Sequence, residues 1–265
     1  MKLKVRSELV FDFEPGTEAI VSVQAAMSPD QSILSETLRI EPDLLIVQDG
    51  PDARGERRFR ATFSGETSIV YEALVENGRR IPLASSLRQL SWRELPEDTL
   101  QYLTASRYCE SDRFGLFVNR EFGELAEGSE RVLAVLDWVH SHVDYIPGVS
   151  TAETTAERTF VDRAGVCRDF SHLGITLCRA LNIPARAVSA YAWKLDPPDF
   201  HAVFEVFLDG GWWLVDPTRL APIDGLVRIG VGRDAADIAF LTTSVSCNGV
   251  SQSVTVEEFV ETLAA

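Results

Sequence analysis

The sequence contains few residues of the kinds that build metal centres and disulfide frameworks. It has four cysteines and four histidines in 265 residues. The cysteines, Cys109, Cys167, Cys178 and Cys247, are widely spaced and form no Cys-x-x-Cys pair. Structural zinc sites and disulfide-stabilised domains depend on closely spaced or paired cysteines. The sequence therefore predicts neither, and we expect the protein to use no metal and no cofactor.

The chain also lacks long apolar runs and an excess of basic residues. No apolar run approaches the roughly 20 residues that a membrane helix needs, and no apolar core of a secretory signal follows residues 1–6. Acidic residues outnumber basic ones by 40 to 25, which gives a net charge of -15. Such a balance disfavours binding to nucleic acid or to an anionic membrane. We expect a cytoplasmic protein with neither partner, and the oligomeric state stays open.

The first 80 residues show the pattern of short antiparallel strands. Apolar side chains occupy the odd positions Leu3, Val5, Leu9, Phe11 and Phe13, which is the period-2 alternation of a half-buried strand. Further strand-like runs follow at residues 18–25, 35–40, 44–47, 57–63 and 68–75. Turn-rich pieces separate them, and no helical segment intervenes. This spacing predicts an antiparallel β-sandwich over residues 1–80.

Helical patterns begin after an extended connection. Residues 81–125 are expected to form a connecting segment with one helix, at about 96–106, where Pro96 suits the first turn. The expected helices then follow at 129–143, 154–161 and 167–181, and the expected strands at 185–191, 200–208, 212–216, 238–246 and 250–256. Helices followed by an antiparallel sheet predict an α+β domain over residues 126–265, with helices packed on the sheet.

Cys167 lies where one of these helices is predicted to begin. Apolar residues repeat at helical spacing after it, at Phe170, Leu173, Leu177 and Leu181. A cysteine attacks a carbonyl carbon as the thiolate. The unpaired N–H groups and positive dipole end of a helix N-terminus stabilise an anion, and such N–H groups can also form part of an oxyanion hole. Cys167 is therefore the candidate nucleophile.

A predicted hairpin brings His201 and Asp216 together. If Asp209-Gly210 forms a two-residue turn, as such pairs favour, Asp216 lies opposite Val203. His201 and Asp216 are then diagonal neighbours on one sheet face, roughly 7–8 Å apart between backbones. A turn at Gly210-Gly211 would shift the pairing by one step and separate them further. The opposite face of the first strand is apolar, with Phe200, Ala202, Phe204, Val206 and Leu208.

These three residue types together are typical of thiol-dependent acyl transfer. Cys167 would attack a carbonyl while His201 exchanges the proton or forms an ion pair with the thiolate. Asp216 would fix the tautomer and orientation of the imidazole. Water or an amine then resolves the acyl-enzyme. This chemistry requires no metal.

Four motifs resemble the transglutaminase-like superfamily of papain-type fold, in its bacterial branch with a β-rich N-terminal domain. They are Ala164-Gly165-Val166-Cys167-Arg168-Asp169-Phe170-Ser171-His172-Leu173, Ala180-Leu181-Asn182-Ile183-Pro184-Ala185-Arg186, Asp199-Phe200-His201-Ala202-Val203-Phe204-Glu205 and Trp213-Leu214-Val215-Asp216-Pro217-Thr218. The segment Gly232-Arg233-Asp234-Ala235-Ala236-Asp237 also looks like this branch. The resemblance covers residues 125–240 and, more loosely, the first 80. It implies a nucleophile at Cys167, a base at His201 and a third member at Asp216, in a hydrolase or acyltransferase that acts on peptides.

Three functions follow as hypotheses. The first is a cysteine protease or amidase that cleaves peptide or amide bonds of a peptide or protein substrate through an acyl-enzyme on Cys167. The second is a transglutaminase-type acyltransferase, in which an amine replaces water. The third is a non-catalytic peptide-binding or scaffold module, against which the complete set of three residues argues. We expect Cys109, Cys178 and Cys247 to be core residues and His172 to serve packing or hydrogen bonding.

Overall fold

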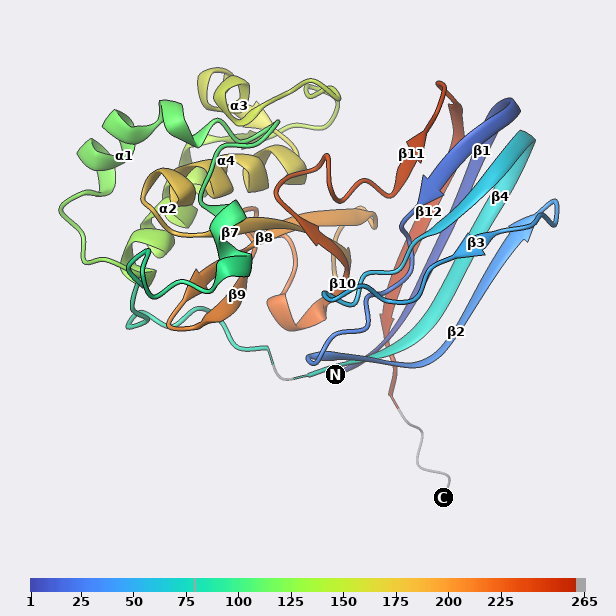
Figure 1. The fold of residues 1–265 in the computed structure, drawn as a ribbon, viewed down its shortest axis with the longest axis horizontal. Coiled ribbons are helices and arrows are strands. Elements are labelled where there is room, and N and C mark those ends of the chain that lie inside the picture. The colour runs from blue at the N-terminus through green and yellow to red at the C-terminus, as the bar shows by residue number, and fades with distance from the viewer. Residues whose placement is uncertain (79, 261–265) are drawn as a thin grey trace.

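The computed structural model describes residues 1–78 and 80–260 and has a mixed helix and sheet architecture with antiparallel sheets. The prediction of an α+β fold is confirmed. Figure 1 shows the two parts side by side, with the long strands in one layer and the helices packed around a smaller sheet in the other. The last residues of the expected 126–265 domain, 261–265, lie outside the described part of the chain.

The larger sheet joins strands from both ends of the chain. In the described part of the chain it has six strands: β1 (Lys2–Val21), β2 (Gln31–Glu41), β3 (Val47–Gln48), β4 (Phe59–Asn77), β11 (Leu241–Thr243) and β12 (Asn248–Glu258). The strands β4 and β12 flank β1, so that Leu3 pairs with both Val75 and Glu258. Strands β11 and β12 were expected within the domain at residues 126–265, but they belong to the sheet that begins at the N-terminus. The boundaries expected at residues 80 and 125 therefore do not separate the larger sheet from the rest of the chain.

In two places, successive runs that the sequence predicts as separate strands form one long strand. The strand β1 runs through Pro15-Gly16, where the sequence predicts an end, and β4 runs through Gly65. The register between them shifts from Phe13↔Gly65 to Thr17↔Phe63. The φ angles of Gly16 and Gly65 are 86° and 72°, values that glycine tolerates. The residues that favour a turn therefore form a β-bulge, which bends the paired strands β1 and β4 without ending them.

The helices follow the expected order. They are α1 (Gly115–Phe122), α2 (Ser129–His142), α3 (Ala156–Asp162) and α4 (Cys167–Ala180), with 3₁₀ helices at Glu97–Tyr102, Ser111–Arg113 and Ile223–Gly225. The helix expected at 96–106 is the first of these 3₁₀ turns. Thr155 caps α3, because its side chain accepts a hydrogen bond from the Arg158 N–H. The expected apolar face of α2 is buried, including Val132, Val135 and Val139.

The smaller sheet carries the predicted hairpin. Its strand order is β10 (Leu226–Gly232), β7 (Ala185–Ala192), β8 (Phe200–Leu208) and β9 (Gly211–Val215). Leu208 pairs with Gly211, and Phe204 pairs with Val215, as the Asp209-Gly210 turn predicts. A further parallel pair joins β5 (Asp144–Tyr145) to β6 (Ala164–Gly165).

Close contact between α4 and β8 fixes the height of the helix above the sheet. A Cβ atom built on Gly174 would lie 2.6 Å from the Phe204 ring, inside van der Waals contact. The Ser171 hydroxyl donates to the Ala202 carbonyl at 2.9 Å, which ties the helix to the same strand. Buried side chains of both elements share one core, among them Leu173, Leu177 and Val206. Glycine at 174 therefore permits the approach that seats α4 on the sheet.

Candidate active site

The first turn of α4 presents Cys167 at its N-terminus. Cys167 is the first helical residue and is half-buried. The Asp169 carboxylate, fully buried, accepts the Val166 N–H at 2.8 Å and so caps the helix start. Gly165 leaves the room this needs, since a Cβ there would lie 2.6 Å from Asp169 Cβ. Arg168 in turn pairs with Asp169 at 3.1 Å.

His201 and Asp216 meet as the hairpin register predicts. His201 Nε2 lies 2.9 Å from Asp216 Oδ2, and both side chains are buried. The other carboxylate oxygen, Oδ1, accepts the Thr218 N–H at 2.9 Å and the Thr218 hydroxyl at 2.6 Å. Ala221 N–H adds a further donor to Oδ2 at 3.2 Å. The carboxylate is thus held on several sides, which fixes the direction in which it holds the imidazole.

The electrostatics of the pair favour a charged imidazole. Burial disfavours the charge, but the hydrogen bond and the charge of Asp216, together with the Cys167 side chain, raise the pKa of His201 to about 10. Burial likewise opposes ionisation of Asp216, yet hydrogen bonds from His201 and Thr218 hold its pKa below the ordinary value. The Cys167 thiol therefore has a neighbour that carries a positive charge at neutral pH.

The second ring nitrogen of His201 is available for proton transfer. Nδ1 is buried and has no hydrogen-bond partner of full geometry among the described residues. Cys167 nonetheless lies close enough to influence the ring. Because Nε2 is held by Asp216, Nδ1 is the nitrogen left to exchange a proton with the sulfur or with a substrate. The three predicted residues are therefore brought together.

Tyr145 also lies beside Cys167, although nothing in the sequence predicts a catalytic role for it. Its strand β5 pairs with Gly165, two residues before the cysteine, and its ring lies 5.8 Å from that of Phe170. The Tyr145 side chain lies close enough to Cys167 for the two groups to interact. Burial raises the pKa of Tyr145 to about 12, and the charges of Cys167 and Asp199 add to the rise. The phenol therefore stays protonated beside the thiol.

Thr218 is a second contact that sequence reasoning missed. It stands in the quoted motif two residues after Asp216, where its hydroxyl and N–H both reach the carboxylate. Hydroxyl residues two positions from an aspartate commonly form such local turns. The two-residue spacing from Asp216 therefore favours the contact that Thr218 makes. The sequence around Tyr145 contains no comparable pattern, because a two-residue strand has no periodicity.

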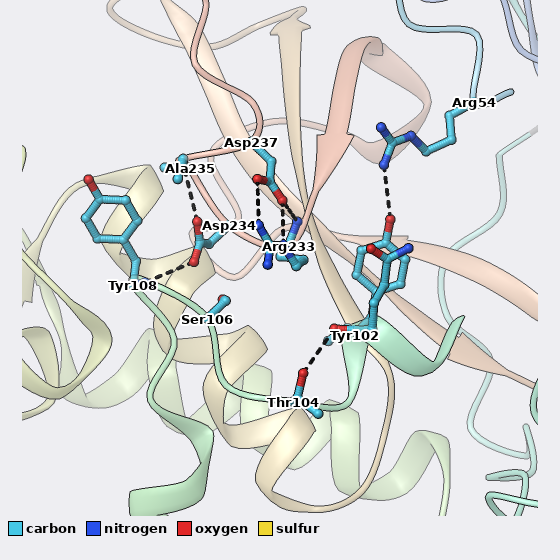
Figure 2. A network of polar contacts seen from close by, with 12 residues as sticks. Arg54, Tyr102, Thr104, Ser106, Tyr108, Arg233, Asp234, Ala235 and Asp237 are labelled. Carbon is cyan, nitrogen blue, oxygen red and sulfur yellow. Dashed lines mark hydrogen bonds and ion pairs between the residues drawn. The ribbon is translucent and has the colours of Figure 1, made fainter. Parts of the chain in front are cut away.

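A polar network around His172 connects α4 to the segment that follows β10. His172 is buried, accepts the Ala235 N–H at 3.1 Å on Nε2 and stacks on Tyr108 at 5.1 Å. Figure 2 shows Asp234 next to Tyr108, whose N–H it accepts at 2.9 Å. Burial lowers the pKa of His172 to about 4, so the ring is neutral at neutral pH. The expected packing and hydrogen-bonding role of His172 is confirmed.

The remaining cysteines are placed apart from the site. Cys109 and Cys178 are buried and Cys247 is half-buried, and all are unpaired. Burial raises the pKa of both Cys109 and Cys178 above the ordinary value. No cluster of three or more His, Cys, Asp or Glu side chains able to hold a metal ion occurs within residues 1–78 and 80–260. In the same ranges, no helix is long and apolar enough to cross a membrane.

Comparison with known proteins identifies the family. The model of the transglutaminase-like superfamily matches residues 118–217, which contain Cys167, His201 and Asp216. A solved structure from Cytophaga hutchinsonii, described as a "putative cysteine protease", is similar over the whole chain. It is 37% identical, with a TM-score of 0.93, and the match covers 100% of this chain and 92% of that one. The chain belongs to the transglutaminase-like superfamily.

Mycobacterial relatives are more distant. An uncharacterized protein of Mycobacterium leprae is 28% identical over 200 residues, which are 70% of each chain. An uncharacterized protein of Mycobacterium tuberculosis is 27% identical over 133 residues, or 44% of this chain and 42% of the relative. The chain thus spans less than half of the M. tuberculosis protein.

Proposed function

We propose that the protein is a cysteine hydrolase that cleaves peptide or amide bonds through an acyl-enzyme on Cys167. The observation that carries the proposal is the buried His201–Asp216 pair beside a half-buried cysteine at a helix N-terminus. A binding module has no use for a buried charged imidazole directed by a fixed carboxylate. The resemblance to the Cytophaga hutchinsonii protein supports the same reaction class.

Acylation uses the three groups in sequence. The Cys167 sulfur, as thiolate, adds to the carbonyl carbon, and the negative charge moves to the carbonyl oxygen. The Cys167 N–H at the start of α4 and the nearby Tyr145 hydroxyl are the groups that we propose stabilise that oxygen. The imidazolium of His201 gives its proton to the leaving nitrogen, the C–N bond breaks and the amine departs. Asp216 keeps the ring oriented throughout.

Deacylation restores the thiol by the reverse proton path. Neutral His201 takes a proton from water as the water oxygen attacks the thioester carbonyl. The C–S bond then breaks, the carboxylic acid leaves and the sulfur returns to its ion pair with His201. If an amine attacks in place of water, the same steps form a new amide. Hydrolysis and amine transfer therefore differ only in the acyl acceptor.

The proposal is tested with N-acetylated amino-acid p-nitrophenyl esters, which acylate thiol hydrolases without a demand for a long substrate. We expect a burst of p-nitrophenolate equal to the enzyme concentration and a thioester adduct at Cys167 in peptide mass spectra. The Cys167→Ala variant should lose both, and Cys178→Ala should retain both. Absence of an adduct in the folded protein would instead favour a non-catalytic module.

The acyl acceptor is read from the products of the same reaction. Hydrolysis predicts free N-acetyl amino acid as the main product at millimolar amine. Product that consists mainly of the amide would assign the protein as an acyltransferase of transglutaminase type. Profiling of proteome-derived peptides with the wild-type protein and Cys167→Ala then identifies the sequences that are cleaved.

A further inference from the structure

A strand of the larger sheet contacts the residue that stands two positions before His201, the proposed base. Gln252 lies on β12, opposite Leu9 of β1. Its side-chain amide donates to Asp199 Oδ1. Asp199 stands two residues before His201, at the start of β8, so the backbones of the two residues are within about 7 Å. The strand that returns from the helical part of the chain therefore holds an acidic residue beside the proposed base.

The Asp199 carboxylate is oriented but not neutralised. Oδ1 accepts both the Gln252 amide and the Phe200 N–H, the latter at 2.7 Å. Within residues 1–78 and 80–260, Oδ2 accepts no hydrogen bond and no ion pair involves Asp199. The nearest cation along the chain, Lys194, lies 4.0 Å above the Trp193 ring. Asp199 is exposed. One oxygen is consequently free to accept a donor from solvent.

This charge belongs to the surroundings of the nucleophile. The charge of Asp199 acts on Tyr145, which lies beside Cys167. Asp199 and Tyr145 come from separate segments, which lie on the smaller sheet and beside α4 respectively. Asp199 directly precedes β8 and stands two residues before His201, so the two side chains leave the same face of the chain. A substrate whose carbonyl carbon is held between Cys167 and His201 would therefore lie near the free carboxylate oxygen.

We propose that Asp199, held by Gln252, is a specificity residue that recognises a positively charged group of the substrate near the reacting carbonyl. The chemical class is a primary ammonium or guanidinium, such as a lysine or arginine side chain. A neutral amide donor on one carboxylate oxygen leaves the full negative charge for such a cation. The inference rests on the proposed function, because it concerns the substrate of the same site.

Charged thiol reagents test the local field without any hydrolytic activity. The reagents are methanethiosulfonates with a trimethylammonioethyl or a sulfonatoethyl group, used on a Cys247→Ser background. The Cys167 sulfur attacks the reagent sulfur, a disulfide forms and methanesulfinate leaves. We expect Asp199→Asn to lower the ratio of cationic to anionic rates about 3- to 5-fold, as an exposed ion pair supports. High salt should reduce the wild-type ratio.

Two ester substrates test recognition in the reaction itself. N-acetyl-lysine and N-acetyl-norleucine p-nitrophenyl esters differ by the ammonium group at nearly equal length. We expect wild-type acylation to favour the lysine ester and Asp199→Asn to reduce that preference about 3- to 5-fold. Asp196→Asn removes a nearby exposed charge in the same loop and is the matched control, with an unchanged ratio. Gln252→Ala should reduce the preference in part.

The acceptor side is measured in the same experiment. Cadaverine keeps a charged second amine when its first amine attacks, whereas pentylamine has no such charge. A preference for cadaverine that Asp199→Asn removes, with no lysine-ester preference, would place the cation on the acyl acceptor. Equal ratios for wild type and Asp199→Asn in the reagent and both substrate measurements would overturn the inference. Failure of both esters to acylate Cys167 would count against the proposed function alone, since the reagent ratio needs only a thiol.

Discussion

The His201 ring is held by Asp216 through a 2.9 Å contact at Nε2, while its Nδ1 has no partner of full geometry in the described chain. The carboxylate thus determines which ring nitrogen is free. Because Asp216 is itself held by Thr218, rotation of the ring would break several hydrogen bonds. The proposed base is therefore oriented before any substrate arrives, which would lower the cost of reaching the transition state.

Replacement of Asp216 by asparagine should greatly reduce acylation. An amide at this position can no longer stabilise the imidazolium and can hold the wrong tautomer. We expect the burst rate with an activated ester to fall by about 10²- to 10⁴-fold, the upper value being that of a serine-protease triad. Stopped-flow release of p-nitrophenolate measures it. An unchanged rate in a folded Asp216→Asn protein would remove Asp216 from the mechanism.

The raised pKa of His201 predicts that the free energy of unfolding falls at alkaline pH. The unfolded-state pKa of His201 is near 6.5 and the folded-state pKa is about 10, so folding favours the protonated ring. This stabilisation is fully present below about pH 6.5 and is lost as the pH rises through about 10. Urea unfolding at pH 6, 8 and 10 should show falling stability in the wild type. His201→Gln should weaken this pH dependence of the free energy of unfolding. His140→Gln, which alters an exposed histidine, should leave the pH dependence unchanged.

Removal of the Tyr145 hydroxyl should slow the reaction with little change in stability. Tyr145 is 42% exposed, and its side chain lies beside Cys167. Loss of one oxyanion donor typically costs about 10²- to 10³-fold. We expect Tyr145→Phe to lose at least about 10-fold in acylation rate and less than about 1 kcal/mol in unfolding free energy. A rate equal to wild type would show that the hydroxyl does not act on the oxyanion.

A methyl group at position 174 should lift α4 from the sheet. The Gly174→Ala side chain would meet the Phe204 ring at 2.6 Å and 2.8 Å, so either the helix or the ring must move. Such overpacking typically costs about 1–3 kcal/mol. Gly115→Ala is the matched control, because nothing lies within 4 Å of its Cβ. Denaturant unfolding of both variants compares them, and equal stability would contradict the close approach.

A buried ion network between the two sheets predicts that replacement of Arg228 lowers the free energy of unfolding strongly. Its guanidinium pairs with Glu205 on β8 and with Asp30 of the larger sheet's connecting turn, the latter at 2.8 Å. Arg228→Met leaves both carboxylates short of a partner, although Arg186 stays with Glu205 at 2.7 Å. We expect a loss of about 3 kcal/mol.

The matched control for Arg228 is an arginine of an exposed pair. Arg39 lies 3.4 Å from Glu72, and its side chain is 60% exposed. Arg39→Met should cost no more than about 1 kcal/mol, because water screens such pairs. Chemical unfolding distinguishes the two variants, and a similar loss in both would show that the network contributes no more than a surface pair.

The hairpin and the helix start at Cys167 could be predicted from the sequence because both depend on local chemistry. Asp209 and Gly210 have φ angles of 51° and 82°, which such a two-residue turn requires. Once the turn is known, the period of two fixes the pairing of His201 with Asp216. The helix start at Cys167 likewise follows from the apolar spacing after it. Local signals therefore sufficed for the three proposed catalytic residues.

Apart from the local contact of Thr218 with Asp216, the contacts that sequence reasoning missed are non-local. The pairing of Leu3 with Glu258 joins residues 255 positions apart and leaves no mark on either strand. Tyr145 reaches Cys167 through a two-residue strand, too short for any periodic pattern. Pro15-Gly16 has the composition of a turn, yet β4 continues alongside and turns it into a bulge. In each case a tertiary partner decided a conformation that the local residues leave open.

The return of β12 to β1 has a consequence for the order of folding. One flank of β1 can be paired with β4 early, but the other awaits residues 248–258. At a synthesis rate of about 5–20 residues per second, that flank stays open for roughly 12–50 seconds after residue 3 is made. The helices and the smaller sheet are synthesised while the larger sheet is still incomplete. Completion of the β1–β12 ladder is thus expected to be a late event, and it also delivers Gln252 to Asp199.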